Sequence, residues 1–378
     1  MKKIVVVSDS FKGTLSSSEI GKMVKETAPR FFPGCEVVAI PVADGGEGTV
    51  ECFLESTASQ PVTVNVSGPY GEEVEAVYAR QGETAVIEMA AAAGLPMVGD
   101  RKDPSRTTTY GVGEIMAHAV KNGCKKILLG LGGSCTTDGG CGCAAALGVV
   151  FKNEDGESFV PVGENMDEIV SIDLAPAKEL LEGVEITVMC DVTNPLYGPT
   201  GAAYVFGPQK GADPAMVEML DQKLRVFSQA LERKLGSTPE AMPGAGAAGG
   251  MGAGCVALMG AVLKPGIEAI LDTVGFDASL EGADLVITGE GRIDSQSLHG
   301  KVISGVVGRT KPRNVPVIAI VGSISDDACG AYDLGVGAMF SINRQPLPFK
   351  EAAPRSAMSY QRTLEDILRL VRIAENMK

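Results

Sequence analysis

The chain has 378 residues with 47 acidic and 33 basic side chains, which gives a net charge of −14. This length predicts two or three domains, and this charge excludes a general nucleic-acid surface, which needs clustered positive charge. A small anionic substrate stays compatible with the charge, because a local basic pocket can form in an acidic protein. The nine cysteines follow no scaffold pattern and there are only two histidines, so we expect buried thiols rather than a zinc site.

The N-terminal segment predicts a buried strand. Residues 4–8 read IVVVS, an apolar run too short for the core of a signal peptide. Elsewhere no apolar run reaches the ~18 residues that a membrane span requires. We therefore expect a cytoplasmic protein without a membrane partner.

Strands, loops and helices then alternate. Ser16 and Glu19 have the spacing of a capping box and predict a helix start, and residues 36–40 and 49–57 predict a second strand and a second helix. This alternation is typical of a doubly wound parallel sheet.

The pattern changes near residue 60 and changes back near residue 283. Residues 60–90 alternate apolar and polar side chains around glycine turns, which predicts antiparallel hairpins, whereas buried strands and helices alternate again from residue 283. We expect two α/β domains: a discontinuous Rossmann-like domain of residues 1–60 and 280–378, and an inserted mixed α+β domain of residues 61–279. The active site is expected in the cleft between them, since ligand sites favour domain interfaces.

Neither standard nucleotide motif is present in its proper context. The segment SQSLHGKV at 295–302 resembles a P-loop but has Ser295 and Val302 where glycine and a hydroxyl residue are needed. A G-x-G-x-x-G pattern at Gly244, Gly246 and Gly249 does not follow an apolar strand, so it is a weak signal for a dinucleotide site.

The segment LGLGGSCTTDGGCGCAAALG at 129–148 has a better context. It begins in a predicted strand, KKILLGL, and ends in a predicted small-residue helix, GGCGCAAALG, with glycines and hydroxyl residues between them. Glycine N–H groups, hydroxyls and a helix N-terminus can hold a phosphate there. The alternative is a close strand-to-helix crossing without a ligand.

Other strand ends carry acidic and basic side chains. Asp44 and Glu47 could bind Mg²⁺ or cap a helix, and Glu290, Arg292 and Asp294 could form a binding loop or a structural ion pair.

Lys12, Asp191 and the two histidines are further candidates, each weighed against a structural alternative. Lys12 could neutralise a substrate anion or be solvated, and Asp191 could be a general base or start an Asx-turn. Of the histidines, His118 is expected to pack on a helix, whereas His299 lies in a loop and could contact a ligand.

Taken together, these loops resemble those of bacterial glycerate kinases of the type that lacks a Walker motif. The resemblance rests on DSFKGTLS, PVADGGEGT, IEMAAAAGL, TTTYGVGE, GLGGSCTTDGG, CDVTNPLYGPTGAAYVFGPQKGA and ADLVITGEGRIDSQSLHGK, in this order. It implies two α/β domains and phosphorylation of D-glycerate by ATP with Mg²⁺, usually to 2-phosphoglycerate. The alternatives are a 3-phosphoglycerate product, a NAD-dependent hydroxyacid dehydrogenase and a non-catalytic binding protein.

The resemblance also implies roles for individual residues. Asp191 is the expected base, and Lys12 and Arg292 are expected to hold the glycerate carboxylate or the transferring phosphate. The expected binding groups are Ser10, Lys12, Arg292 and Asp294 for the substrate, Gly132, Gly133, Ser134 and Thr137 for the phosphates of ATP, and Asp44, Glu47 and Asp294 for Mg²⁺. We expect a monomer or a homodimer that binds no nucleic acid.

Overall fold

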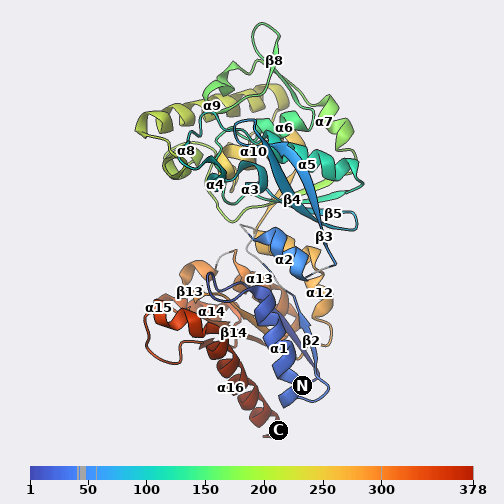
Figure 1. The fold of residues 1–378 in the computed structure, drawn as a ribbon, viewed down its shortest axis with the longest axis vertical. Coiled ribbons are helices and arrows are strands. Elements are labelled where there is room, and N and C mark those ends of the chain that lie inside the picture. The colour runs from blue at the N-terminus through green and yellow to red at the C-terminus, as the bar shows by residue number, and fades with distance from the viewer. Residues whose placement is uncertain (41, 43–47, 57, 299, 378) are drawn as a thin grey trace. The chain divides into compact units, whose positions relative to one another are not determined.

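The computed structural model describes residues 1–40, 42, 48–56, 58–298 and 300–377 (Figure 1). The chain divides into two compact units. The first contains Met1–Asp44, Glu51–Thr57 and Pro265–Lys378, and the second contains Gly45–Val50 and Ala58–Lys264. In the described ranges, no helix is long and apolar enough to cross a bilayer.

The first unit is built on a parallel sheet of five strands. Its order is β16-β14-β12-β1-β2, and every neighbouring pair is parallel. The strands are β1 (Lys3–Ser8), β2 (Glu36–Ala39), β12 (Leu285–Gly289), β14 (Val317–Val321) and β16 (Ala338–Ser341).

Helices cover both faces of this sheet. Ile4 and Val6 belong to the apolar cluster under α1 (Ser17–Phe31) and α16 (Ser356–Asn376), which lie side by side in Figure 1. Because side chains alternate along a strand, buried Val5 and Val7 face the other side, and α13 (Val302–Thr310) packs on β1, β12 and β14. The expected doubly wound parallel fold is confirmed.

The predicted start of the first helix is also confirmed. The N–H of Glu19 donates to Ser16 Oγ at 3.1 Å, and the N–H of Ser16 donates to Glu19 Oε2 at 2.8 Å. This capping box satisfies two backbone donors that the first turn of α1 would otherwise leave unpaired.

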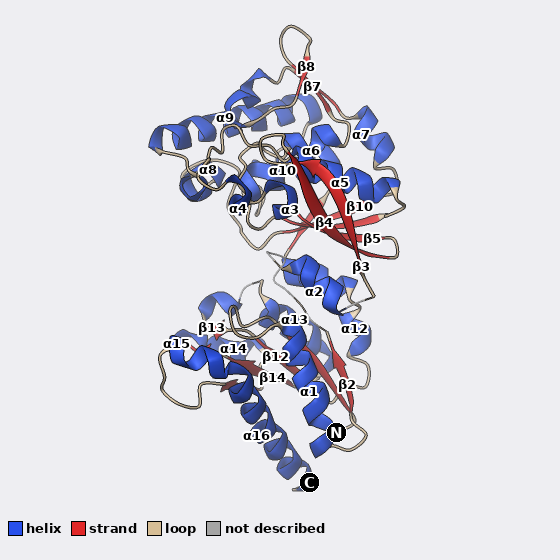
Figure 2. Ribbon diagram, viewed as in Figure 1, coloured by secondary structure: helices blue, strands red, loops and turns tan. Residues whose placement is uncertain are grey.

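The second unit contains a mixed sheet of six strands in the order β11-β10-β6-β5-β4-β3 (Figure 2). The first four are parallel and the last two complete the antiparallel hairpins expected from the alternating pattern. Their bounds are β3 (Gln60–Ser67), β4 (Glu73–Gln81), β5 (Thr84–Glu88), β6 (Lys126–Gly130), β10 (Glu185–Met189) and β11 (Val262–Lys264). The largest helices are α5 (Tyr110–Lys121), α9 (Pro214–Leu235) and α10 (Ala247–Met259).

The second boundary between the units differs from the expected one. Residues 265–279, expected in the inserted domain, form α11 (Gly266–Thr273) and α12 (Phe276–Ser279) of the first unit. Arg309 of α13 holds both helices, because its guanidinium donates to Asp272 at 2.8 Å and to Asp277 at 3.0 Å. These long-range ion pairs leave no local signal in the sequence.

Candidate functional site

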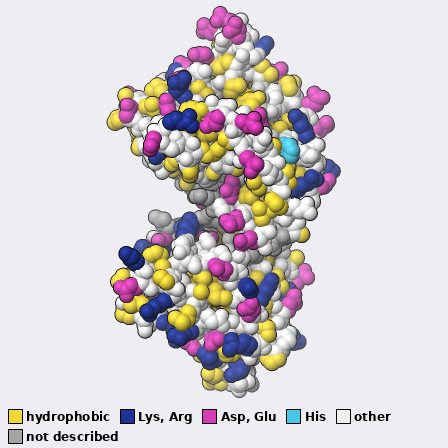
Figure 3. Space-filling model, viewed as in Figure 1, with side chains coloured by type: hydrophobic (Ala, Val, Ile, Leu, Met, Phe, Trp, Pro, Cys, Tyr) yellow, Lys and Arg dark blue, Asp and Glu magenta, His cyan; other side chains and the backbone are white. Residues whose placement is uncertain are grey.

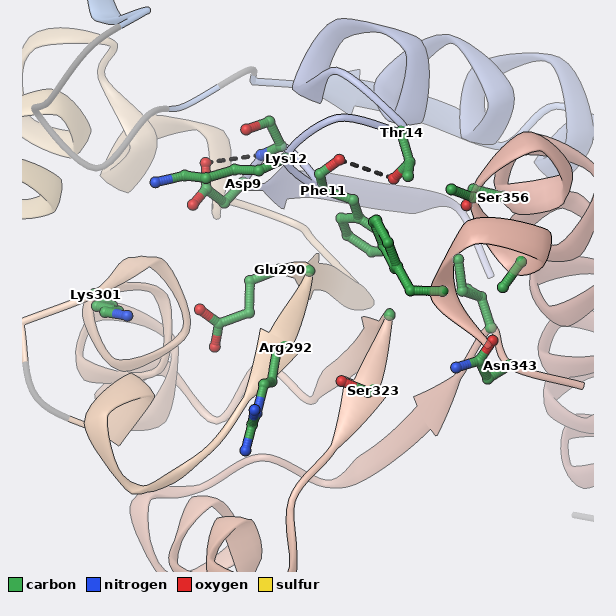
Figure 4. A pocket seen from close by; sticks show the side chains of 17 residues that line it. Asp9, Phe11, Lys12, Thr14, Glu290, Arg292, Lys301, Ser323, Asn343 and Ser356 are labelled. Carbon is green, nitrogen blue, oxygen red and sulfur yellow. Dashed lines mark hydrogen bonds between the residues drawn. The ribbon is translucent and has the colours of Figure 1, made fainter. Parts of the chain in front are cut away.

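A cavity of about 370 Å³ lies at the carboxyl ends of the parallel strands of the first unit (Figure 4). The loops after β1, β12, β14 and β16 all contribute to its wall. The chain runs from β1 to β2 on one side and places β12 on the other side, so the strand order reverses between β1 and β12. Ligands of open α/β sheets bind at such a switch point.

The loop after β1 brings two of the expected substrate residues to this cavity. Ser10 and Lys12 both line it, and Lys12 is exposed. The loop is anchored by Asp9, whose N–H donates to the carbonyl of Gly289 at 2.8 Å and whose Oδ1 accepts from the N–H of Ser10 at 2.7 Å. Phe11 holds the other side of the loop, with its ring 5.9 Å from that of Tyr360.

Glu290, the first residue after β12, is buried in the wall of this cavity. It is 6% exposed, and its Oε1 has no hydrogen-bond partner among the described residues. Figure 4 shows its carboxylate directed into the cavity on the side of Lys301. Burial raises its pKa from 4.5 to about 7, with Asp9 and Asp294 adding to the rise and Ser297 and Lys301 opposing it.

Arg292 and Asp294 lie on the same loop and have the contacts of the structural alternative, an ion pair within the loop. Arg292 is one of the residues that line the cavity, but its side chain extends away from Glu290 (Figure 4). Its Nε donates to Ser325 Oγ at 3.0 Å. Asp294 lies 3.8 Å from Arg292 Nε and also accepts from the N–H of Ser297 at 3.3 Å. In this conformation both residues stabilise the loop.

Lys301 is a cavity residue that the sequence analysis did not single out. It occupies the N-cap position of α13 and lines the cavity opposite the loop after β1. The available signal was the Gly-Lys pair directly before an apolar helix, in the segment that fails as a P-loop.

The surface beside the cavity is basic although the chain is acidic. Figure 3 shows Lys and Arg side chains gathered over α15 (Phe349–Ala352) and α16. A second cavity of about 220 Å³ shares Asn343 and Ala352 with the first and is lined by Arg344, Arg355 and Arg362. Arg344 is paired with Asp366 at 2.7 Å, so Arg355 and Arg362 are the arginines of this cavity best placed to attract an anion.

In the second unit, the glycine-rich loop follows β6 as expected. Gly130 pairs with Glu88 of β5 and with Met189 of β10, so the loop and Asp191 follow neighbouring parallel strands at one edge of the sheet. Gly133 is exposed, Gly132 is partly exposed and Ser134 is 8% exposed.

Thr137, a predicted contact of the nucleotide, is buried in this structure. It is 1% exposed and packs against Gly249 of α10, where a Cβ would lie 2.5 Å from the Thr137 Cα. Gly249 adopts φ +67°, which glycine adopts without strain. Thr137 therefore holds the turn in this conformation.

Asp138 ties the same loop to two helices. Its Oδ2 accepts from the N–H and the hydroxyl of Thr109, both at 2.8 Å, and from the N–H of Gly142 at 3.2 Å, while Oδ1 accepts from the N–H of Gly140 at 3.0 Å. Burial raises its pKa, and these hydrogen bonds act in the opposite direction. Thr109 directly precedes α5, so one carboxylate connects the start of α5 with the start of α6 (Cys141–Ala146).

Lys210 holds the glycine-rich loop through a buried hydrogen bond. It is 2% exposed, and its Nζ donates to the carbonyl of Thr136 at 2.6 Å. Burial lowers its pKa from 10.5 to about 8, although nearby Cys135 and Asp138 oppose this change. Lys210 holds the backbone of the loop and is too deeply buried to contact a ligand in this conformation.

Three of the expected ligand residues lie outside the described residues: Asp44, Glu47 and His299. Within the described part of the chain, no three His, Cys, Asp or Glu side chains are grouped as metal ligands. Asp294 is therefore the one expected Mg²⁺ ligand whose surroundings the structure describes, and its contacts are those of a turn.

Comparison with known proteins agrees with this geometry. A model of the glycerate kinase family matches residues 4–372. The chain belongs to the glycerate kinase family. A glycerate kinase of Bacillus cereus is 44% identical over 98% of both chains, and a glycerate 2-kinase of Escherichia coli is 43% identical over 90% of both. The crystal structure of a protein described as glycerate kinase 2 from Salmonella typhimurium LT2 superposes with a TM-score of 0.89 at 40% identity, covering 99% of each chain.

Membership of this family identifies the chain as an enzyme of the phosphotransferase class. The cavity of the first unit is lined by Lys12, Arg292 and Lys301, whose side chains are of the kind that binds a small anion.

Proposed function

We propose that this enzyme transfers the γ-phosphoryl group of ATP to D-glycerate, and that the product is 2-phosphoglycerate. The observation that carries the proposal is the cavity at the switch point of the parallel sheet, where Lys12 and Lys301 line a pocket of small volume. Supporting it, a relative named glycerate 2-kinase is 43% identical over 90% of both chains.

The lysines provide the charge that glycerate needs. A carboxylate that enters the cavity loses water, and Lys12 and Lys301 replace that hydration with charge-assisted hydrogen bonds. We place the hydroxyl of Ser10 beside them as a substrate ligand, with Arg292 and Asp294 at the rim. A small polar substrate fits because polar side chains from several loops surround a pocket of this size.

The nucleotide residues remain those expected from the sequence. Gly132, Gly133 and Ser134 follow β6 and are the proposed contacts for the phosphates of ATP, since glycine allows backbone N–H groups to approach an anion closely. Mg²⁺ would enter bound to ATP and neutralise charge on its phosphates. Asp44 and Glu47 stay predicted ligands for it.

The direct experiment is a phosphorus NMR spectrum of the purified protein incubated with ATP, MgCl₂ and D-glycerate. We expect ADP and a new phosphomonoester signal identical to that of authentic 2-phosphoglycerate. A signal that matches 3-phosphoglycerate would correct the position of transfer, and no glycerate-dependent loss of ATP would contradict the proposed activity. Incubation with NAD and glycerate, followed by NADH absorbance, tests the dehydrogenase alternative.

Asp191→Asn tests the base predicted from the sequence. If Asp191 accepts the proton of the substrate hydroxyl, turnover falls by orders of magnitude while the far-UV circular dichroism spectrum is retained. Near-normal turnover removes Asp191 from the mechanism.

A further inference from the structure

Glu290 is a buried acid whose cost to the fold is only partly offset by hydrogen bonds within the fold. It is 6% exposed, and its Oε1 finds no partner in the described ranges of the chain. A buried polar atom without a partner costs about 1–3 kcal/mol, and more when it is charged. Such a cost is typical of functional sites, where a group is kept ready for a ligand.

The backbone around Glu290 is held rigidly. A Cβ on Gly289 would lie 1.9 Å from the carbonyl oxygen of Ile320 in β14, so this strand end tolerates no side chain. The carbonyl of Glu290 accepts from the N–H of Gly322 at 3.1 Å, and that of Gly291 accepts from the N–H of Ser323 at 3.1 Å. Gly289 is therefore fixed by glycine-dependent packing and Gly291 by its backbone hydrogen bond, and Figure 4 shows the side chain of Glu290 between them directed into the cavity.

The charges that face Glu290 come from three segments. Asp9 lies on the loop after β1, Asp294 on the loop after β12, and Lys301 at the start of α13, while Lys12 and Arg292 line the same cavity. Burial and the two acids raise the pKa of Glu290 to about 7, and Lys301 limits the rise. A carboxylate with a pKa near the operating pH can both accept and release a proton efficiently.

We propose that Glu290 accepts the proton of the glycerate hydroxyl during phosphoryl transfer, a role that the sequence analysis gave to Asp191. The inference rests on the proposed function and concerns which carboxylate acts in it. The hydroxyl oxygen forms a bond to the γ-phosphorus of ATP while its proton passes to Glu290 Oε1. The bond from the γ-phosphorus to the β–γ bridging oxygen breaks, and ADP leaves with that electron pair.

The unpartnered oxygen explains why this carboxylate suits the role. Oε1 has a free acceptor site, and the carboxylate that carries it is directed into the cavity that Lys12 and Lys301 also line. A glycerate whose carboxylate is held by the lysines can offer a hydroxyl to that site. Binding thus supplies the missing hydrogen bond and positions the proton for transfer.

Glu290→Gln is the main test, because the amide keeps the shape of the side chain and cannot accept the proton. Glu281→Gln is the matched control: Glu281 is exposed and lies just before β12, at the opposite end of the strand from Glu290. We expect kcat to fall at least about 100-fold in Glu290→Gln with a much smaller change in the KM for glycerate. We expect kcat and KM to stay within about 3-fold of wild type in the control.

The pH profile separates proton acceptance from a structural role. In the wild type, log kcat/KM should rise with pH up to about 7 and then level, and this acid limb should disappear from the residual activity of Glu290→Gln. Glu290→Asp keeps a carboxylate and should retain the limb with a lower kcat, even if the amide variant does not fold.

The outcomes distinguish the inference from the proposed function. A wild-type protein that makes no phosphoglycerate contradicts the function itself. An active wild type with Glu290→Gln within about 3-fold of it, or with an acid limb that persists in Glu290→Gln and vanishes in Asp191→Asn, overturns the role of Glu290.

Discussion

Asp9 and Glu290 occupy equivalent positions on neighbouring parallel strands. Ser8 of β1 and Gly289 of β12 are register partners, and the N–H of Asp9 donates to the carbonyl of Gly289 at 2.8 Å. Each acid is therefore the first residue beyond its strand, on either side of the switch point. Burial is the main cause of the raised pKa of Glu290, and Asp9, held beside it by the pairing of the two strands, adds to the rise.

Lys301→Met tests the cationic side of the cavity. Loss of a charge-assisted hydrogen bond to the substrate carboxylate should raise the KM for glycerate about 10- to 100-fold. Since Lys301 lowers the pKa of Glu290, the acid limb of kcat/KM should also move to higher pH. Lys311→Met is the control, because exposed Lys311 directly follows α13 and donates to the carbonyl of Asp333 at 3.2 Å. Equal effects of the two substitutions would contradict a specific role for Lys301.

Glu290→Gln should also change stability in a pH-dependent way. The folded pKa of about 7 exceeds the ordinary value of 4.5, so the folded state binds more protons than the unfolded state between these values. Wild-type stability therefore falls as pH rises through this window, by at most about 3 kcal/mol. Glu290→Gln has no carboxyl group to ionise, so its stability should not fall in this pH window for this reason.

The measurement is the thermal unfolding midpoint at about pH 5 and about pH 8. The unfolding midpoint of Glu290→Gln minus that of wild type should be more positive at the higher pH. The same difference for Glu281→Gln should not change with pH. A difference that is the same at both pH values would mean that Glu290 ionises normally.

Lys210→Met tests the buried lysine under the glycine-rich loop. Its folded pKa of about 8 lies below the ordinary value of 10.5, so the unfolded state binds the additional proton between these values. The stability contributed by Lys210 therefore rises with pH through this window in the wild type. Lys210→Met has no group to titrate, so it lacks this rise. We expect the wild-type advantage in urea unfolding to grow from about pH 8 to about pH 10.

Exposed Lys234, near the end of α9, provides the control for this experiment. Lys234→Met should show no dependence of its stability difference on pH in the same window. A stability difference for Lys210→Met that shrinks with rising pH would mean that burial does not lower the pKa of Lys210.

Asp138→Asn should loosen the glycine-rich loop. The amide nitrogen would face at least one N–H that now donates to the carboxylate, and an unsatisfied buried donor costs about 1–3 kcal/mol. We expect a loss of this size in urea unfolding, together with a higher KM for ATP if the loop binds its phosphates. Asp155→Asn, in an exposed turn, should change neither quantity. An unchanged KM for ATP alongside the loss of stability would limit Asp138 to a structural role.

Local patterns were sufficient for much of the fold. The apolar run of β1, the capping box of α1 and the hairpins of β3 and β4 each depend on residues close in sequence, and the structure confirms them. The assignment of α11 and α12 failed because it depends on ion pairs to Arg309, 32 or more residues away. Composition does not change at that boundary.

The candidate site was predictable as a set of loops and less so as a set of contacts. Ser10, Lys12 and Arg292 do line one cavity, because parallel strands end at one edge of a sheet. Sequence alone could not show that Thr137 is buried by α10, that Arg292 turns toward Ser325, or that Glu290 has an unpartnered oxygen. Each of these facts depends on packing between segments more than 30 residues apart or on the depth of burial.

The register of β1 with β12 has a consequence for synthesis on the ribosome. Ile4 pairs with Leu285, so the first strand waits for its partner while about 280 further residues are added, roughly 15–60 s at about 5–20 residues per second. Ala58–Lys264 of the second unit emerge completely during that interval, whereas β1 has only β2 beside it. β1 therefore lacks one of its two neighbouring strands during most of synthesis, and the cavity is completed only near the end of translation, because Ser356 is part of its wall.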